Sequence, residues 1–177
     1  MKMVLMIIGG LLLVVMGFGL FRASQLRTIQ ITKSVIVNGS RQEVFDMVKY
    51  LRNFPQWSPF LAADPTQKYQ IKGNDGHVGA RYHWEGNKGK DLGYQEIVEI
   101  EALDFIGMKC DIQKPFKAAP TFEYSFSEAG GGIKVTQDFK LESGLVDAFF
   151  MWVFGAKKEM EATNEKGLKL LKAAVEG

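Results

Sequence analysis

The chain has 177 residues, with 22 lysines and arginines against 20 aspartates and glutamates, which leaves a net charge of +2. This near-balance argues against a nucleic-acid-binding protein, because such proteins usually carry a basic excess on one face. Hydrophobic residues make up 46% and charged residues 24% of the chain, as in an ordinary folded globular protein. Cys110 is the single cysteine, which excludes an intrachain disulfide and a zinc site built from several thiolates.

The N-terminal region contains an uninterrupted apolar run. Met3 to Phe21 is 19 residues long and carries no charged or polar side chain. As a helix it would measure about 28 Å, close to the thickness of the hydrocarbon core of a bilayer. We therefore expect residues 1–22 to form a single-pass transmembrane anchor, followed by a linker over residues 23–28.

A cleaved signal peptide is the alternative interpretation of this run, with small residues around Phe18 as the cleavage site. The run is longer than the usual apolar core of a signal peptide, which favours a retained anchor. Arg22, Arg27 and Lys33 follow the run with no acidic residue before Glu43. By the positive-inside rule they favour a cytoplasmic domain, although the charges of Lys2 and the N-terminus precede the span.

The first elements after the linker are a strand and a helix. Residues 29–37 alternate, with Ile29, Ile31, Val35 and Val37 on one face, which predicts a strand. Ser40 followed by Glu43 has the spacing of a capping box, and helical spacing of apolar residues then predicts a helix over 41–51. The prolines at 55 and 59 allow at most a short second helix over residues 54–60.

Six further strands are predicted, separated by turn-forming residues. Apolar residues alternate with polar ones most regularly in the last three, so we expect an antiparallel sheet with one buried face. The predicted strands cover residues 67–72, 79–86, 91–101, 104–112, 119–127 and 132–142. A long C-terminal helix follows, with Met160, Leu168, Leu171 and Val175 on one stripe that Asn164 and Gly167 make narrow.

Two stretches carry a resemblance to a known family. Residues 53–60 read NFPQWSPF and residues 79–87 read GARYHWEGN; the C-terminal helix contains EKGLKLLK at 165–172. With the order of elements, these stretches resemble the SRPBCC superfamily, START-like proteins of the polyketide cyclase/dehydrase and lipid-transport type. The resemblance covers residues 29–177. It implies an α+β helix-grip fold, in which a seven-stranded antiparallel sheet curls around the long C-terminal helix.

Such a fold would enclose a space lined mainly by apolar side chains, the usual character of a small-molecule site. We expect the bound molecule to be hydrophobic, such as a lipid, an isoprenoid or a polyketide-like ring. Packed side chains filling the whole space are the alternative. The candidate ligand-binding residues are Trp57, Tyr82, Trp84, Met108, Phe122, Tyr124, Phe126, Phe150 and Trp152.

Candidate catalytic residues are few. Arg81, His83 and Glu85 share one face of a predicted strand, and Tyr82 lies on the other. Histidine is suited to proton transfer near neutral pH, but this face is expected to meet solvent if Tyr82 faces the core. Cys110 is expected to be a small core residue, since no activating base is evident. We expect no bound metal and no cofactor, because neither histidine has metal-ligand spacing and no phosphate-binding motif is present.

The leading hypothesis is therefore a membrane-anchored domain that binds or transfers a hydrophobic small molecule or lipid. The alternatives are a cyclase- or dehydratase-like enzyme and a domain that binds a partner protein. The segment 145–154 has apolar residues on nearly every side, whereas a helix packed on a core needs only one apolar stripe. Some of its aromatic rings should therefore remain outside the core. We expect the surplus among Phe149, Phe150, Trp152 and Phe154 to form a gate at the bilayer surface, with complete burial as the alternative.

Overall fold

A computed structural model describes residues 10 and 16–177 of the chain. Seven strands form one antiparallel sheet in the order β1-β7-β6-β5-β4-β3-β2. The strands are β1 (Thr28–Val37), β2 (Lys68–Lys72), β3 (Arg81–Gly86), β4 (Asp91–Glu101), β5 (Phe105–Lys114), β6 (Thr121–Ala129) and β7 (Gly132–Glu142). The helices are α2 (Arg41–Lys49), α3 (Phe54–Trp57), α4 (Leu145–Val153) and α5 (Ala156–Glu176), with short 3₁₀ turns η1 (Leu51–Asn53) and η2 (Asn87–Gly89).

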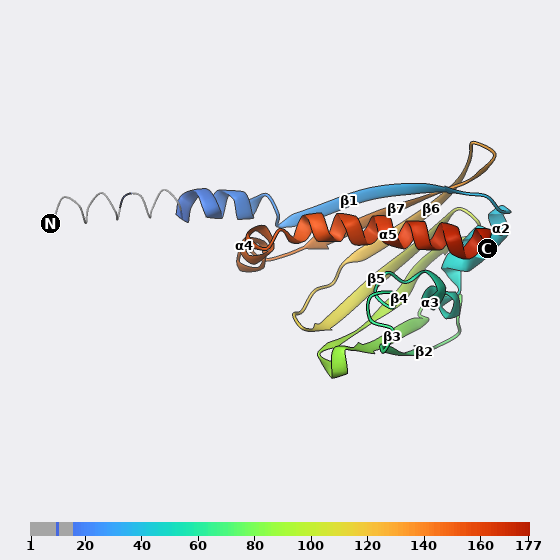
Figure 1. The fold of residues 1–177 in the computed structure, drawn as a ribbon, viewed down its shortest axis with the longest axis horizontal. Helices are drawn as coiled ribbons and strands as arrows, with labels where there is room; N and C mark the ends of the chain where they lie inside the picture. Colours follow the sequence, from blue (N-terminus) through green and yellow to red (C-terminus); the bar gives the residue numbers. More distant parts are fainter. Residues whose placement is uncertain (1–9, 11–15) are drawn as a thin grey trace.

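The long helix α5 lies along the sheet, as the helix-grip expectation requires (Figure 1). It packs against β1, β7 and α3, while α2 and α3 lie near its C-terminal end. The short helix α4 lies at the opposite end, beside the N-terminal helical segment (Figure 1). The fold is thus a sheet covered on one face by α5, and the predicted seven-stranded α+β architecture is confirmed.

Alternation along the strands explains which face is buried. Along β7, Ile133, Val135, Phe139 and Leu141 are buried, as predicted, and the intervening Lys134 and Lys140 are exposed. All six predicted later strands are present, with ends that shift by no more than two residues. β6 joins β7 through Gly130 and Gly131, whose φ angles of 59° and 81° fit a tight hairpin that side chains would strain.

The predicted helix over 41–51 ends two residues early, at Lys49. Its N-terminus begins as expected, because the Ser40 side chain accepts a hydrogen bond from the Glu43 backbone N–H at 3.2 Å. At its C-terminal end the Leu51 N–H donates to the Asp75 carboxylate at 2.7 Å instead of continuing the helix. A distant side chain therefore sets this boundary, which local spacing did not indicate.

The buried side chains form two clusters. The larger cluster joins α2, α3 and α5 to the middle of the sheet and includes Trp57, Tyr124 and Leu171. The smaller one contains Ile29, Ile31, Phe139 and Leu141 from β1 and β7, with Met151 of α4 and Met160 of α5 packed against it. The smaller cluster fixes α4 to the domain.

Most of the predicted anchor, residues 1–9 and 11–15, lies outside the described residues. Residues 16–24, which are described, are helical and lead into β1. In the described part of the chain, no helix is both long and apolar enough to cross a membrane.

Candidate functional site

The space between the sheet and α5 is nearly filled. Its enclosed volume is about 20 Å³, room for about one water molecule. In this conformation, side chains therefore occupy the space that the fold would otherwise leave between sheet and helix. The lining residues come from α3 and the segment after it, from β4, β6 and β7, and from α5: Phe54, Trp57, Pro59, Phe60, Gln95, Phe122, Tyr124, Gln137, Thr163, Asn164 and Gly167.

The buried side chains of Gln95, Gln137 and Asn164 and the Tyr124 hydroxyl supply the polar atoms of this lining. The Gln137 amide nitrogen of β7 donates a hydrogen bond to the Tyr124 hydroxyl of β6 at 2.9 Å. The Gln137 Oε1 atom and the Asn164 Nδ2 atom of α5 are buried and have no hydrogen-bond partner in the described part of the chain. One unpaired acceptor and one unpaired donor thus belong to residues that line the same enclosed space.

The interior groups are neutral at physiological pH. Burial raises the pKa of the Tyr124 hydroxyl well above its usual range, against the opposing effect of the Gln137 hydrogen bond. Burial also raises the pKa of the nearby Cys110 thiol to about 12. Cys110 faces the Gln95 amide at 3.9 Å and is buried, so it is a core residue as predicted. The lining therefore supplies hydrogen bonds without a side chain that titrates near neutral pH.

The wall opposite the sheet is formed by α3 and the residues after it. Trp57 is buried, stands edge-on to Tyr124 and donates from Nε1 to the Met47 carbonyl at 3.2 Å. The Ser58 hydroxyl accepts from the Leu61 N–H at 3.2 Å, so Ser58 stabilises the turn after α3. Pro59 packs on α5 at Gly167, where an added Cβ would lie in ordinary contact with the proline ring at 3.5 Å. Both residues line the space.

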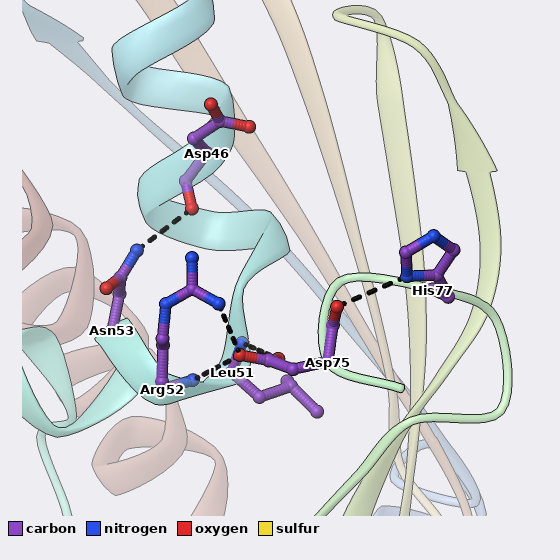
Figure 2. Close-up of polar contacts among 6 residues, drawn as sticks. All are labelled: Asp46, Leu51, Arg52, Asn53, Asp75 and His77. Carbon is purple, nitrogen blue, oxygen red and sulfur yellow. Dashed lines mark hydrogen bonds and ion pairs between the residues drawn. The ribbon is translucent and has the colours of Figure 1, made fainter. Parts of the chain in front are cut away.

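The loop between β2 and β3 holds this wall in place (Figure 2). The Asp75 carboxylate accepts from the backbone N–H groups of Leu51 and Arg52, at 2.7 and 3.4 Å, and pairs with the Arg52 guanidinium at 3.3 Å. The Asn53 amide donates to the Asp46 carbonyl at 3.1 Å, which ties η1 back to α2. His77 lies in this loop, with Nδ1 3.2 Å from the Asp75 carbonyl. Asp75 thereby holds the start of η1, the turn that leads into α3.

We expect Asp75→Ala to destabilise the protein by about 1–3 kcal/mol, because the Leu51 N–H would lose its acceptor. The ion pair with the exposed Arg52 adds little to this loss. Asp75→Asn is the matched control, since its amide oxygen still accepts from Leu51. Urea unfolding should place the asparagine variant nearer to wild type, and equal losses for the two variants would contradict the capping role.

The structure divides the nine candidate ligand-binding residues into several groups. Trp57, Phe122 and Tyr124 line the enclosed space. Tyr82, Met108 and Phe126 are buried in the larger cluster without lining that space, and Trp84 is half-buried at its edge. Phe150 and Trp152 belong to α4, where Phe150 is exposed and Trp152 is half-buried.

The candidate catalytic residues do not meet in the interior. Arg81 is exposed, pairs with Glu96 at 2.7 Å and lies over the Tyr94 ring. The His83 ring lies against the same Tyr94 ring, with centroids 5.2 Å apart, and Glu85 is exposed. The surface interpretation of this strand face is therefore confirmed for Arg81 and Glu85. Tyr82 is buried, and burial raises the pKa of its hydroxyl above the usual range.

His83 borders a wide, open depression of about 320 Å³ over β2, β3 and β4. Lys68, Gln70 and Glu85 share its lining. Burial, and then the charges of Lys72 and Arg81, lower the pKa of His83, so its imidazole is neutral at pH 7. No group of three or more potential metal ligands occurs among residues 10 and 16–177.

Sequence reasoning missed three polar residues of the interior, Gln95, Gln137 and Asn164, as candidate ligand contacts. The signal was present for each. Gln137 lies between Val135 and Phe139 on the buried face of β7, and Gln95 precedes Ile97 on that of β4. Asn164 interrupts the apolar stripe of α5. A polar residue at a buried position of a strand or helix was therefore the relevant pattern.

Solved structures with similar folds include several bacterial proteins. A protein from Chromobacterium violaceum is 12% identical, with a TM-score of 0.61, over 84% of this chain and 98% of its own. A protein from Rhizobium leguminosarum is 15% identical, with a TM-score of 0.61, over 84% of this chain and 95% of its own. A di-domain aromatase/cyclase from the steffimycin biosynthetic pathway is 12% identical, with a TM-score of 0.62, over 84% of this chain and 51% of its own.

These low identities establish the fold alone. No curated protein matches the chain significantly. The family model described as polyketide cyclase / dehydrase and lipid transport matches residues 28–176, which include every strand and α2 to α5. The match covers far more than half of the chain and agrees with the helix-grip architecture. The chain therefore belongs to the polyketide cyclase / dehydrase and lipid transport family.

Proposed function

We propose that this domain binds an uncharged hydrophobic small molecule between the sheet and α5. The observation that carries the proposal is the pair of unpartnered amide atoms, Gln137 Oε1 and Asn164 Nδ2, in an otherwise aromatic lining. Each such atom costs about 1–3 kcal/mol when buried without a partner. A ligand that donates to Gln137 and accepts from Asn164 would remove both costs.

The two unpaired amide atoms define the polar group that the ligand would need. A hydroxyl group is the simplest group that both donates and accepts one hydrogen bond. The rest of the ligand would contact Trp57, Phe122 and Tyr124, which favour a flat or chain-like apolar body. The ligand class is thus a neutral lipid, isoprenoid or aromatic alcohol or enol. Entry requires Pro59 to move away from Gly167, because the closed space holds about one water molecule.

The same lining favours binding over proton-transfer catalysis. A general acid or base works best when its pKa lies near the working pH. The interior offers amides, a tyrosine with a raised pKa and a thiol with a pKa raised to about 12. A cyclase-like enzyme would have to act through orientation and hydrogen bonding of its substrate. Binding or transfer is therefore the function proposed.

Attachment to a membrane is a further part of the proposal. Its support is the apolar run Met3–Phe21, whose length suits a single span, and the helical form of residues 16–24. The basic residues Arg22, Arg27 and Lys33 after the run favour a domain on the cytoplasmic side. A domain held in this way would take up its ligand at the lipid surface.

The proposed function can be tested with two probes that differ in one polar group, 2-naphthol and 2-methylnaphthalene. We expect both to bind wild-type protein, with 2-naphthol bound about tenfold more tightly, the effect of one buried hydrogen bond of about 1.4 kcal/mol. Asn164→Leu should reduce this preference, because only the hydrogen bond to Gln137 remains, and should keep binding of 2-methylnaphthalene. Dissociation constants from calorimetry or tryptophan quenching measure both effects.

Ser127→Ala is the control variant, because Ser127 is exposed on β6 and away from the lining. It should retain the tenfold preference of wild type. Absence of binding by both probes would overturn the proposed site. Binding with a preference that Asn164→Leu leaves intact would overturn the role given to the amide pair.

A further inference from the structure

The helix α4 presents an exposed row of apolar side chains. Val146, Phe150 and Val153 follow each other at helical spacing and are 69%, 53% and 52% exposed. Phe154, directly after the helix, is 74% exposed. On the opposite side Ala148 is fully buried, so one face of the helix packs on the domain and the other face is exposed. The predicted surplus of rings is present at Phe150 and Phe154.

The exposed face of α4 adjoins the N-terminal helical segment. The Phe18 ring meets the Trp152 ring edge-on, with centroids 6.4 Å apart. Gly19 brings the backbone of this segment close to α4, since a Cβ there would lie 3.3 Å from the Phe149 ring and 3.4 Å from the Trp152 ring. The Ser143 N–H donates to the Arg27 carbonyl at 2.8 Å, which joins the linker to the start of α4.

Exposed cations flank this apolar surface on two sides. Arg22 lies in the last turn of the N-terminal helical segment and Arg27 follows that segment, while Lys157 and Lys158 follow α4. Asp147 is the single acidic residue of α4 and lies about 90° around the helix from the middle of the exposed row. An apolar strip bordered by basic residues matches a bilayer with anionic headgroups better than it matches a second protein surface.

We propose that α4 lies flat in the interfacial layer of a membrane, with Val146, Phe150 and Val153 directed into the lipid. Figure 1 shows α4 nearly end-on where the N-terminal helical segment runs across the view, so the two helices are steeply inclined to each other. If that segment follows the membrane normal, α4 lies close to the membrane plane. The inference rests on the membrane attachment in the proposed function and not on the identity of the ligand.

The depth of α4 follows from its contact with the N-terminal helical segment. Phe18 precedes Arg22, the first charged residue after the apolar run, by about 6 Å along a helix. Trp152 contacts Phe18, so α4 lies within the layer that separates hydrocarbon from water. Interfacial helices usually bury their apolar face about 5–10 Å deep at this boundary, and tryptophan is enriched there. Both features agree with the position of α4.

Site-specific labels on the full-length protein test this arrangement. Cys110 is buried and its thiol pKa is raised to about 12, so thiol reagents will label an introduced cysteine selectively. Val153→Cys reports on the exposed row, and Ala173→Cys on the far end of α5 is the matched control, since both residues are exposed and uncharged. Each variant carries an environment-sensitive fluorophore and is reconstituted in phosphatidylcholine/phosphatidylglycerol vesicles that contain nitroxide-labelled lipid.

We expect blue-shifted emission and several-fold stronger nitroxide quenching for the label at 153 than for the label at 173. Equal quenching at the two positions in protein that floats with the vesicles and resists alkaline carbonate would overturn the inference and leave the anchor intact. Protein that washes off the vesicles would overturn the anchor and the inference together. Cysteine cross-linking between copies through position 153, without lipid quenching, would also overturn it. Naphthol binding, measured on the same samples, tests the ligand site separately.

Discussion

Replacing Trp57 with alanine is expected to destabilise the protein by about 3–5 kcal/mol, the usual cost of removing a large buried ring. Trp57 is 2% exposed and stands edge-on to Phe54 and Tyr124, with ring centroids 4.8 and 6.0 Å apart. The substitution also leaves the Met47 carbonyl without the indole N–H. Urea unfolding of purified protein measures the loss.

A second variant and an added ligand test this prediction further. Trp57→Phe keeps a ring and loses the indole hydrogen bond, so we expect a smaller loss than for alanine. Trp57→Ala should also open a cavity beside the enclosed space, and apolar cavities bind small aromatic guests. Added indole should therefore raise the melting temperature of Trp57→Ala more than that of wild type. A loss below about 1 kcal/mol for the alanine variant would contradict the burial of Trp57 in a rigid core.

Gly93→Ala is expected to cost about 1–3 kcal/mol through overpacking. Gly93 lies in β4, where the strand crosses under the Trp84 ring. A Cβ at this position would overlap that ring and approach the Asp111 carbonyl to 2.5 Å. The Trp84 ring is held by its Nε1 hydrogen bond to Asp91 at 2.9 Å, and the Asp111 carbonyl belongs to the backbone, so neither neighbour can yield easily.

Gly167→Ala provides the matched control, because the same methyl group meets a different environment. Its Cβ would lie 3.5 Å from the Pro59 ring, an ordinary contact, within the long helix α5. Alanine is favoured over glycine in a helix by about 1 kcal/mol, so this variant should be as stable as wild type or more so. The melting temperature should therefore fall for Gly93→Ala and stay level or rise for Gly167→Ala. A destabilised Gly167→Ala would mean that the Pro59 contact is tighter than the structure shows.

The strands and their buried faces were predictable because alternation is a local property. Side chains along a strand point to opposite faces in turn, so Val135 and Phe139 on β7 identify the inner face without knowledge of the rest of the fold. The capping spacing at Ser40 likewise predicted where α2 begins. The end of α2 was not predictable in this way, because Asp75, 24 residues away, accepts from the Leu51 N–H.

Local sequence patterns were enough to predict the antiparallel sheet, the long C-terminal helix, the apolar segment 145–154 and the family resemblance. Which interior polar atoms remain unpaired depends on tertiary packing, since Gln137 and Asn164 line the same space only when α5 packs on the sheet. Tertiary packing also placed Arg81 and His83 beside Tyr94 instead of in the interior. Both results depend on contacts between residues distant in the chain, and such contacts follow from packing that no local periodicity encodes.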